Sequence, residues 1–283
     1  MRSIFQDLRL EILSAREKML DAGWRTENFD PRYRIVPHTR FYLPLSGEAS
    51  YDFRGTRYVM RRGVMQILPP FAEVTARCDG ECYLGWINFH CYIGEDTIDV
   101  FSLWQPPWEL PVDDQDYRLR LFRIIRRCVG EAKHASREIR PGALFEAESA
   151  LRLLIYPFLE QIERAAPQQA DPGRLMTLLK YIDDHLDRPL TLEHLAGVMH
   201  CHPNYLAALF SRRMGQSLCR YCRMRKFDRA VKLLNTTEMN ITEIADALGY
   251  ADVNNFSRQF RGCCGLSPRN YRRTLPPYRQ SRP

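Results

Sequence analysis

Two stretches in the last third of the chain share one pattern of small and large apolar residues. Each copy has a small residue, a large apolar residue 10 or 11 positions later, and a second one 4 positions beyond that. The residues are Ala196, Leu206 and Phe210 in one copy and Ala245, Phe256 and Phe260 in the other. This pattern is typical of a helix-turn-helix, where a small residue lets the second helix cross close over the first. Two such units in tandem predict that the last third is all-helical.

Residues around each copy predict where its helices begin and turn. Pro203 stands where a second helix would begin, and proline is favoured in the first turn of a helix. Gly249 suits a turn position with positive φ. Thr242 is expected to cap the first helix of the second copy, with Glu243 near the positive end of that helix.

A long helix is predicted between the two copies, over the sequence SLCRYCRMRKFDRAVKLLN. We expect its apolar residues, such as Phe227 and Leu234, to pack on both units. Basic side chains, including Arg225 and Lys226, are expected to cover the rest of its surface. About 18 helical residues span roughly 27 Å. Such a spacer would place the second helices in successive major-groove segments of DNA, about 34 Å apart, and so make one bivalent reader.

The charge is distributed unevenly along the chain, which carries +7 in total. From Asp171 onward there are 18 Lys and Arg against 10 Asp and Glu, a balance of +8, which leaves −1 for everything before. A basic last third predicts a polyanionic partner, and double-stranded DNA is favoured over a membrane because no basic amphipathic helix with a Trp or Phe face stands out. No run reaches the 18 or so apolar residues of a membrane helix, and the first 20 residues carry charges throughout. We therefore expect a cytoplasmic protein.

The first part of the chain is expected to be β-rich with flanking helices. Between residues 33 and 90, short runs rich in aromatic and β-branched residues alternate with turn signals, which is typical of a β-sandwich or barrel. Apolar residues at nearly helical spacing predict an amphipathic helix over residues 3–20 and two longer helices over 115–134 and 143–164. The two longer helices either pack within their own domain or form the seam of a homodimer, and Pro157 is expected to kink or break the second.

These features predict an α+β chain of two domains. Residues 1–164 would form the domain for effector binding and dimerisation, 165–173 a polar linker, and 174–283 the DNA-binding domain.

The nine cysteines do not follow the spacing of a zinc module. Cys219 and Cys222 have a suitable gap, but they lie inside a predicted helix and lack a second ligand pair. We interpret the cysteines as reduced thiols that act mostly as small apolar residues. No metal site, cofactor site or catalytic constellation is found in the sequence, so we expect a protein that is not an enzyme.

The last hundred residues resemble the DNA-binding domain of the AraC/XylS family of bacterial transcription regulators. The matching positions are Ile244, Gly249, Tyr250, Phe256, Ser257, Arg258, Phe260, Gly265, Ser267, Pro268, Tyr271 and Arg272. The resemblance implies a homodimeric regulator that acts with RNA polymerase and reads bases through the second helix of each unit. Its implied DNA contacts are Asn204, Ala207, Ala208 and Arg212 in the first unit and Asn254, Asn255 and Arg258 in the second.

The first part of the chain resembles the cupin-like effector domain of the sugar-responsive branch of that family, in the run RRGVMQILPP. By this resemblance Trp86 sits where arabinose-responsive members stack their sugar. Aromatic and hydrogen-bonding side chains on the predicted strands are candidates to hold a sugar or related metabolite. The candidates are His38, Arg40, Tyr42, Arg77, Trp86 and Asn88.

Other interpretations of the first domain stay open. Tyr42 and Trp86 are also interpretable as ordinary core aromatics. Alternation along the strand predicts that Arg40 and Tyr42 point to one face of the sheet, with Phe41 and Leu43 on the other, core-filled face. The domain would then serve only to dimerise a ligand-independent regulator. A cupin-type enzyme is a third reading, but His38 and His90 are far apart in the sequence and lack the family's clustered ligand pattern.

Overall fold

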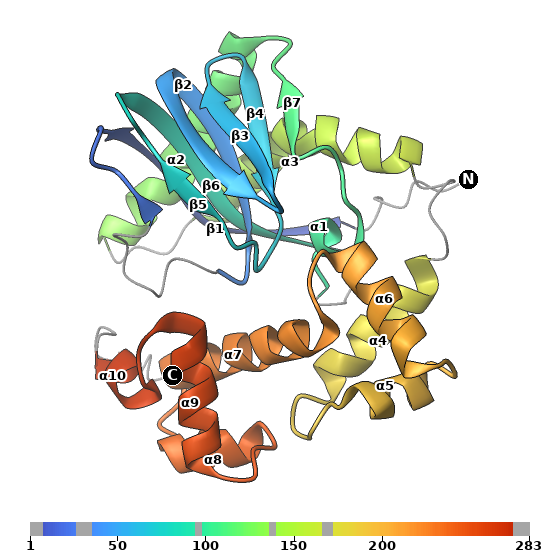
Figure 1. Cartoon of the computed structure of the whole chain (residues 1–283). Coiled ribbons are helices and arrows are strands. Elements are labelled where there is room, and N and C mark those ends of the chain that lie inside the picture. The colour runs from blue at the N-terminus through green and yellow to red at the C-terminus, as the bar shows by residue number, and fades with distance from the viewer. Residues whose placement is uncertain (1–7, 27–35, 94–97, 136–139, 166–171, 274–283) are drawn as a thin grey trace. The chain divides into compact units, whose positions relative to one another are not determined.

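The computed structural model describes residues 8–26, 36–93, 98–135, 140–165 and 172–273. Contacts divide the chain into two compact units, one formed by most of the residues before 173 and the other containing the residues from Gly173 on. The first combines a β-sheet with helices, and the second is all-helical (Figure 1). The predicted linker, 165–173, lies largely outside the described residues.

The first unit is built on an antiparallel sheet of seven strands. Five strands run in the order β1-β6-β2-β4-β7, while β3 and β5 both pair with β2. The strands are β1 (Leu8–Leu20), β2 (Thr39–Phe53), β3 (Thr56–Arg61), β4 (Val64–Leu68), β5 (Thr75–Arg77), β6 (Cys82–Ile93) and β7 (Glu109–Pro111). The β-rich prediction for residues 33–90 is thus confirmed for the part that the structure describes, and the barrel-like closure of a cupin stays a prediction.

Strand β2 joins two runs that the sequence suggests are separate short strands. Its first half pairs with β4 and β6, and its second half, from Glu48, pairs with β3 and β5. The change occurs at a register shift between Pro44 and Ser46, followed by Gly47 with φ +68°. A bulge of this kind bends a strand and re-aims its side chains. The proline and glycine therefore bend this strand instead of ending it.

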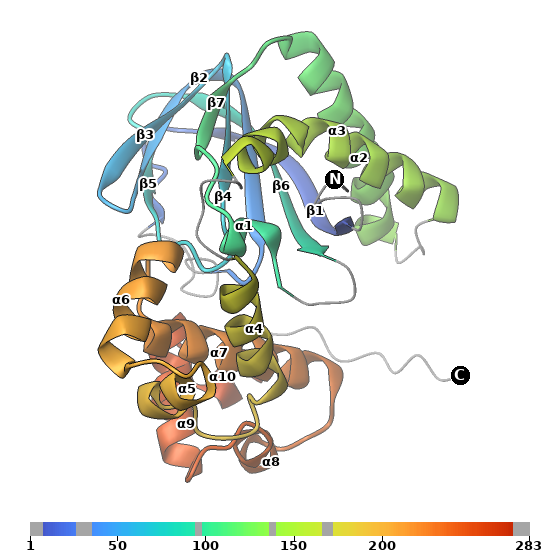
Figure 2. The ribbon, with the colours of Figure 1, turned by 90° about the vertical axis from the view of Figure 1, so that its right-hand side faces the viewer.

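Two long helices pack on one face of the sheet, α2 (Gln115–Ala135) and α3 (Pro141–Ala165), as the two views in Figures 1 and 2 show. Phe41 of β2 meets Phe158 of α3 edge to face, with ring centroids 6.4 Å apart. Both predicted helices are confirmed. Helix α3 continues through Pro157 without ending. A short helix, α1 (Val100–Leu103), follows β6.

The helix predicted for residues 3–20 is wrong where the structure describes it, because Leu8–Leu20 forms strand β1. It pairs with β6 along nearly its whole length. The alternation of Leu8, Leu10 and Ile12 is a strand signal that competes with the helical spacing, and a register shift between Ile12 and Ser14 then obscures it. Tertiary pairing with a buried neighbour decided between the two patterns.

The second unit consists of seven helices within the described residues. They are α4 (Pro172–Asp184), α5 (Leu192–Val198), α6 (Pro203–Met214), α7 (Leu218–Thr236), α8 (Ile241–Ala247), α9 (Val253–Cys264) and α10 (Pro268–Arg273). Helix α7 is the predicted long helix between the two copies. Its Tyr221 packs on Phe210 of α6 and its Phe227 on Phe260 of α9, with centroids 5.4 Å and 4.9 Å apart.

Two local predictions in this unit are wrong. The cap of α8 is Asn240, whose side chain accepts from the Glu243 backbone while the Glu243 carboxylate accepts from the Asn240 backbone. Thr242 lies inside the helix, because this capping box satisfies the helix end two residues earlier. Lys226 is buried and Arg225 half-buried instead of covering the outer surface of α7, since each has a partner: Arg225 pairs with Asp183, and Lys226 bonds backbone carbonyls.

Within the described residues, no helix combines the length and the apolar character needed to cross a bilayer.

Candidate functional site

The two helix pairs α5/α6 and α8/α9 repeat the same arrangement. Ala196 and Ala245 are buried in the first helices, and the second helices bury every fourth residue. Each second helix ends at a glycine with positive φ, Gly215 or Gly265, which caps its last carbonyls. The buried positions are Leu206, Phe210 and Met214 in α6 and Phe256, Phe260 and Cys264 in α9. The helical arrangement predicted from the repeat is therefore what the structure has.

The turn inside each pair requires a residue in the left-handed conformation. In the second pair this residue is Gly249, with φ +66°. In the first pair the corresponding residue is His200, with φ +48°. Glycine adopts this conformation without steric cost, whereas a side chain costs about 1–2 kcal/mol there. The predicted role of Gly249 is confirmed, and the first turn stores strain that the second does not.

The outward surface of α9 carries a small polar network. Asn254 and Arg258 are exposed, and Asn255 is half-buried. The Asn255 Oδ1 accepts from the Arg258 guanidinium at 3.3 Å and from Gln259 Nε2 at 3.1 Å. The Tyr250 hydroxyl donates to Gln259 Oε1 at 3.4 Å, so the network continues into the preceding turn. Gln259 was not among the predicted residues. Its spacing of four from Asn255 on a helix could have indicated it.

The outward surface of α6 is less polar. Asn204, Ala208 and Arg212 are exposed, and Ala207 is half-buried. His202 caps the helix, with its Nδ1 accepting from the Asn204 backbone at 3.3 Å. In both α6 and α9, the predicted DNA contacts lie opposite the buried stripe or beside it, so the structure brings them together on each helix.

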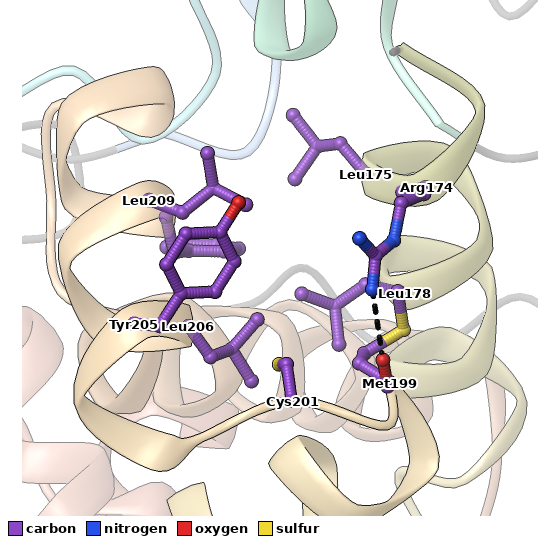
Figure 3. Close-up of a pocket in the computed structure, with 9 residues that line it drawn as sticks. Arg174, Leu175, Leu178, Met199, Cys201, Tyr205, Leu206 and Leu209 are labelled. Carbon is purple, nitrogen blue, oxygen red and sulfur yellow. Dashed lines mark hydrogen bonds between the residues drawn. The ribbon is translucent and has the colours of Figure 1, made fainter. Parts of the chain in front are cut away.

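A pocket with apolar walls lies between α4 and α6 (Figure 3). Arg174 stands beside it and donates to the Met199 carbonyl at 3.0 Å, as the dashed line shows. The other lining residues are Leu175, Leu178, Cys201, Tyr205, Leu206, Leu209 and Phe210. Several of these side chains belong to the core of the first helix pair, so the pocket marks where α4 packs on that pair.

Four of the predicted ligand residues share one face of the sheet. Arg40 lies opposite Asn88, and Tyr42 lies opposite Trp86, in the pairing of β2 with β6. Phe41 and Leu43 point to the other face and are fully buried. This division is the one that alternation predicts. Tyr42 and Trp86 are partly buried and pack against a core cluster of the unit, while Asn88 donates to Ser14 Oγ at 2.9 Å.

Three further polar side chains on this sheet were not predicted: Tyr51, Gln66 and Glu109. Gln66 is fully buried and donates to Glu109 Oε2 at 2.6 Å and to the Val59 carbonyl at 3.0 Å. A glutamine in the middle of the apolar run VMQIL was the available signal, because a buried polar residue is the informative exception in a strand. Sequence reasoning missed Tyr51 because the bulge in β2 interrupts the alternation of side chains, and it missed Glu109 because the segment before it is rich in proline.

Some polar atoms of this face have no hydrogen-bond partner within the described part of the chain. They are Arg40 Nε, Tyr51 Oη and Gln66 Oε1, and all three residues are at least nine-tenths buried. Burial raises the pKa of Tyr51, and Tyr42, Tyr58 and Glu109 raise it further, so its hydroxyl stays protonated. We call Arg40, Tyr42, Tyr51, Gln66 and Trp86 the sheet cluster. Buried polar atoms without partners are costly unless a ligand or water completes them.

The remaining predicted ligand residues lie elsewhere. Arg77 is half-exposed and faces Asp79 at 3.5 Å, on an exposed position of β5. The His38 ring lies edge to face with His90, centroids 6.2 Å apart, so these two distant histidines do meet. Within the described residues, no three His, Cys, Asp or Glu side chains are grouped as they would be around a metal ion.

Comparisons with known proteins agree with the repeated helix pairs. A family model described as a helix-turn-helix domain matches residues 195–274. Regulatory protein SoxS of Salmonella typhimurium is 37% identical over 101 residues, which cover 94% of SoxS and 36% of this chain. The HTH-type transcriptional regulator YobQ of Bacillus subtilis is 27% identical over 149 residues, covering 46% of this chain and 62% of YobQ. The chain thus spans less than two thirds of YobQ, and 12% and 38% of two further Bacillus subtilis regulators, YtdP and YfiF.

Similarity to a solved structure extends over both units. ToxT from Vibrio cholerae aligns with 95% of this chain and 99% of its own, at a TM-score of 0.55 and 13% identity. At that identity the likeness shows a shared fold. The similarity to nearly all of SoxS, together with the helix-turn-helix match, shows that the chain belongs to the AraC/XylS family of DNA-binding transcriptional regulators.

Proposed function

We propose that the chain binds specific DNA sequences through α6 and α9, which we call the reading helices, and regulates transcription from the bound site. The observation that carries this proposal is the repetition of the exposed polar positions. Asn204 in α6 and Asn254 in α9 are both exposed, and each directly follows the first residue of its helix. The first residues of such a helix are those that reach base edges in the major groove. The proposed contacts are Asn204, Ala207, Ala208, Arg212, Asn254, Asn255 and Arg258.

The chemistry of these side chains favours unequal roles for the two reading helices. An arginine bonds guanine and an asparagine bonds adenine through two hydrogen bonds, each worth about 1–3 kcal/mol of discrimination. Helix α9 offers Arg258 and two asparagines. In α6, Ala207 and Ala208 contact at most a thymine methyl, and Arg212 lies a turn further on, near the backbone. We therefore expect the second unit to supply more of the base specificity than the first.

We further propose that the first unit binds a small polyhydroxylated effector, a sugar or related metabolite, at the sheet cluster. A hydroxyl group both donates and accepts hydrogen bonds. It would accept from Arg40 Nε, donate to Gln66 Oε1, and do either with Tyr51. Trp86 offers a flat apolar face for a sugar ring. Buried polar atoms that lack a hydrogen-bond partner among the described residues favour this proposal over a unit that only dimerises. The function needs no catalytic group, metal or cofactor.

Helix α3 supports self-association of the first unit. Its Phe145, Leu153 and Tyr156 are large, apolar or aromatic, and from 50% to 74% exposed. Exposed apolar residues in a row are typical of an interface, and a homodimer is the commonest assembly. We propose that the regulator is a homodimer that contacts RNA polymerase when bound at a promoter.

Selection from random DNA tests whether the chain binds specific DNA sequences. The full chain is mixed with a library of random duplexes, bound duplexes are recovered over several rounds, and the survivors are sequenced. We expect two enriched elements about one helical turn apart. Enrichment of no sequence above the starting library would contradict the proposed function.

Thermal unfolding tests the effector. A ligand that binds only the folded state raises the melting temperature by mass action. We expect a member of a panel of sugars and sugar acids to raise it for the wild type but not for Trp86→Ala. An equal rise for both proteins would place the ligand away from the sheet cluster.

A further inference from the structure

The turn of the second helix pair touches the loop that precedes the first pair, in addition to the connection through α7. Gly249, in the turn between α8 and α9, lies against the loop between α4 and α5. A Cβ atom built on Gly249 would lie 2.6 Å from the Arg188 Cα and would overlap the Asp187 carbonyl. The turn of the second pair and the loop before the first therefore meet backbone to backbone. We call this contact the joint.

One side chain bonds both sides of the joint. The Lys226 ammonium donates to the Arg188 carbonyl at 2.9 Å and to the Leu248 carbonyl at 2.6 Å. It also lies 5.0 Å from the centre of the Tyr250 ring, in cation–π contact. Only 8% of Lys226 is exposed, and burial lowers its pKa, against the opposing effect of Cys222 and Asp187. A cation is costly to bury unless it is fully bonded, and here the two carbonyls and the ring supply its bonds.

The neighbouring ion pair connects different elements. The Arg225 guanidinium donates to both Asp183 carboxylate oxygens, at 2.7 Å and 2.8 Å. Arg225 also faces Asp228 of its own helix at 3.7 Å. These groups tie α7 to α4, on the side of the first pair. Lys226 instead joins backbone of the loop before the first pair to backbone of the turn in the second.

We propose that Lys226 is a positioning residue that fixes the separation and angle between the two reading helices. It touches no DNA in this account. It acts by holding the α8–α9 turn, from which α9 begins, against the loop from which α5 and then α6 follow. A protein with this joint intact prefers one spacing between its two DNA elements, and a protein with the joint released accepts several. The proposal rests on the proposed reading of DNA by α6 and α9.

The test measures how strongly binding depends on the number of base pairs between the two DNA elements. A loss of general stability does not alter this dependence. The selected two-element duplex is compared with versions that carry one or two extra base pairs between the elements, and with a duplex that carries one element. Binding to each is measured for the wild type, Lys226→Met and Lys226→Arg. Lys232→Met is the matched control. Lys232 is exposed on the same helix, and its replacement removes the same charge at a position away from the joint.

We expect the wild type and Lys232→Met to lose at least about tenfold in affinity when the spacing changes. Lys226→Met should lose less than about threefold between spacings while binding the single element like the wild type, and Lys226→Arg should restore the preference. If Lys226→Met does not fold, Lys226→Gln, whose amide can still donate to one carbonyl, should give an intermediate preference.

Two results would overturn the proposal in different ways. A folded Lys226→Met, or Lys226→Gln in its place, that keeps the spacing preference of the wild type would overturn the positioning role alone. A wild type that selects no two-element sequence would overturn the proposed function, and the positioning role with it.

Discussion

Replacing Gly249 with alanine should destabilise the second unit by about 2–5 kcal/mol, for two reasons that the structure separates. The left-handed conformation of residue 249, with φ +66°, costs about 1–2 kcal/mol for a residue with a side chain. The new methyl group would also overlap the Asp187–Arg188 backbone, and forcing an extra carbon into a packed contact typically costs about 1–3 kcal/mol more. The methyl meets backbone, so no flexible side chain can move away to relieve the overlap.

The positions of the tryptophans make this prediction easy to measure in the full chain. All four tryptophans, at positions 24, 86, 104 and 108, belong to the first unit. Their fluorescence during denaturant unfolding reports that unit, whereas far-ultraviolet circular dichroism also reports the helices of the second. We expect Gly249→Ala to shift part of the circular dichroism transition to lower denaturant and to leave the fluorescence transition in place. An unfolding free energy within about 0.5 kcal/mol of the wild type would refute the reasoning.

Placing glycine at His200, the position in the first pair that is equivalent to Gly249, should stabilise the second unit instead. His200 is exposed and has φ +48°, so His200→Gly relieves about 1–2 kcal/mol of strain. The added freedom of the unfolded chain offsets about 0.5–1 kcal/mol of this gain. We expect a net stabilisation of about 0.5–1 kcal/mol, by the same measurement.

Three further predictions follow from the site. Arg258→Ala should weaken binding to the selected DNA by about 1–3 kcal/mol and binding to unrelated DNA by less, in a titration at fixed salt; equal losses would mean that Arg258 contacts only phosphate. Tyr51→Phe should leave the free energy of unfolding unchanged or raise it by up to about 1 kcal/mol, because the lost hydroxyl has no hydrogen-bond partner in the described part of the chain, and should abolish the thermal shift from the effector. Replacing Phe145 and Leu153 together with aspartate should produce a monomer in analytical ultracentrifugation, and an unchanged mass would exclude this face of α3 as the dimer interface.

The helical part of the fold was predictable from the sequence because its signals are local. The spacing of Ala196, Leu206 and Phe210 depends only on helix geometry, and it recurs, so two weak patterns support each other. The failures came where long-range contacts decided the outcome. Leu8–Leu20 is a strand because β6 lies beside it, and Lys226 is buried because Arg188 and Leu248, distant in sequence, supply its carbonyls.

The sheet cluster was predicted only in part for the same reason. Alternation along β2 is a local rule, and it correctly separates Arg40 and Tyr42 from Phe41. The rule fails across the bulge after Pro44, so Tyr51 could not be assigned to a face. Glu109 reaches Gln66 only through the pairing of β4 with β7, which no local pattern indicates.

Repeating the DNA selection with one reading helix altered at a time tests the central claim most directly. One variant replaces Asn254, Asn255 and Arg258 with alanine, and the other replaces Asn204 and Arg212. We predict that each variant still enriches DNA but loses base preference at one element only, a different element for each variant. Loss of preference at both elements in either variant, or at neither, would contradict the account that each helix pair reads its own segment of the duplex.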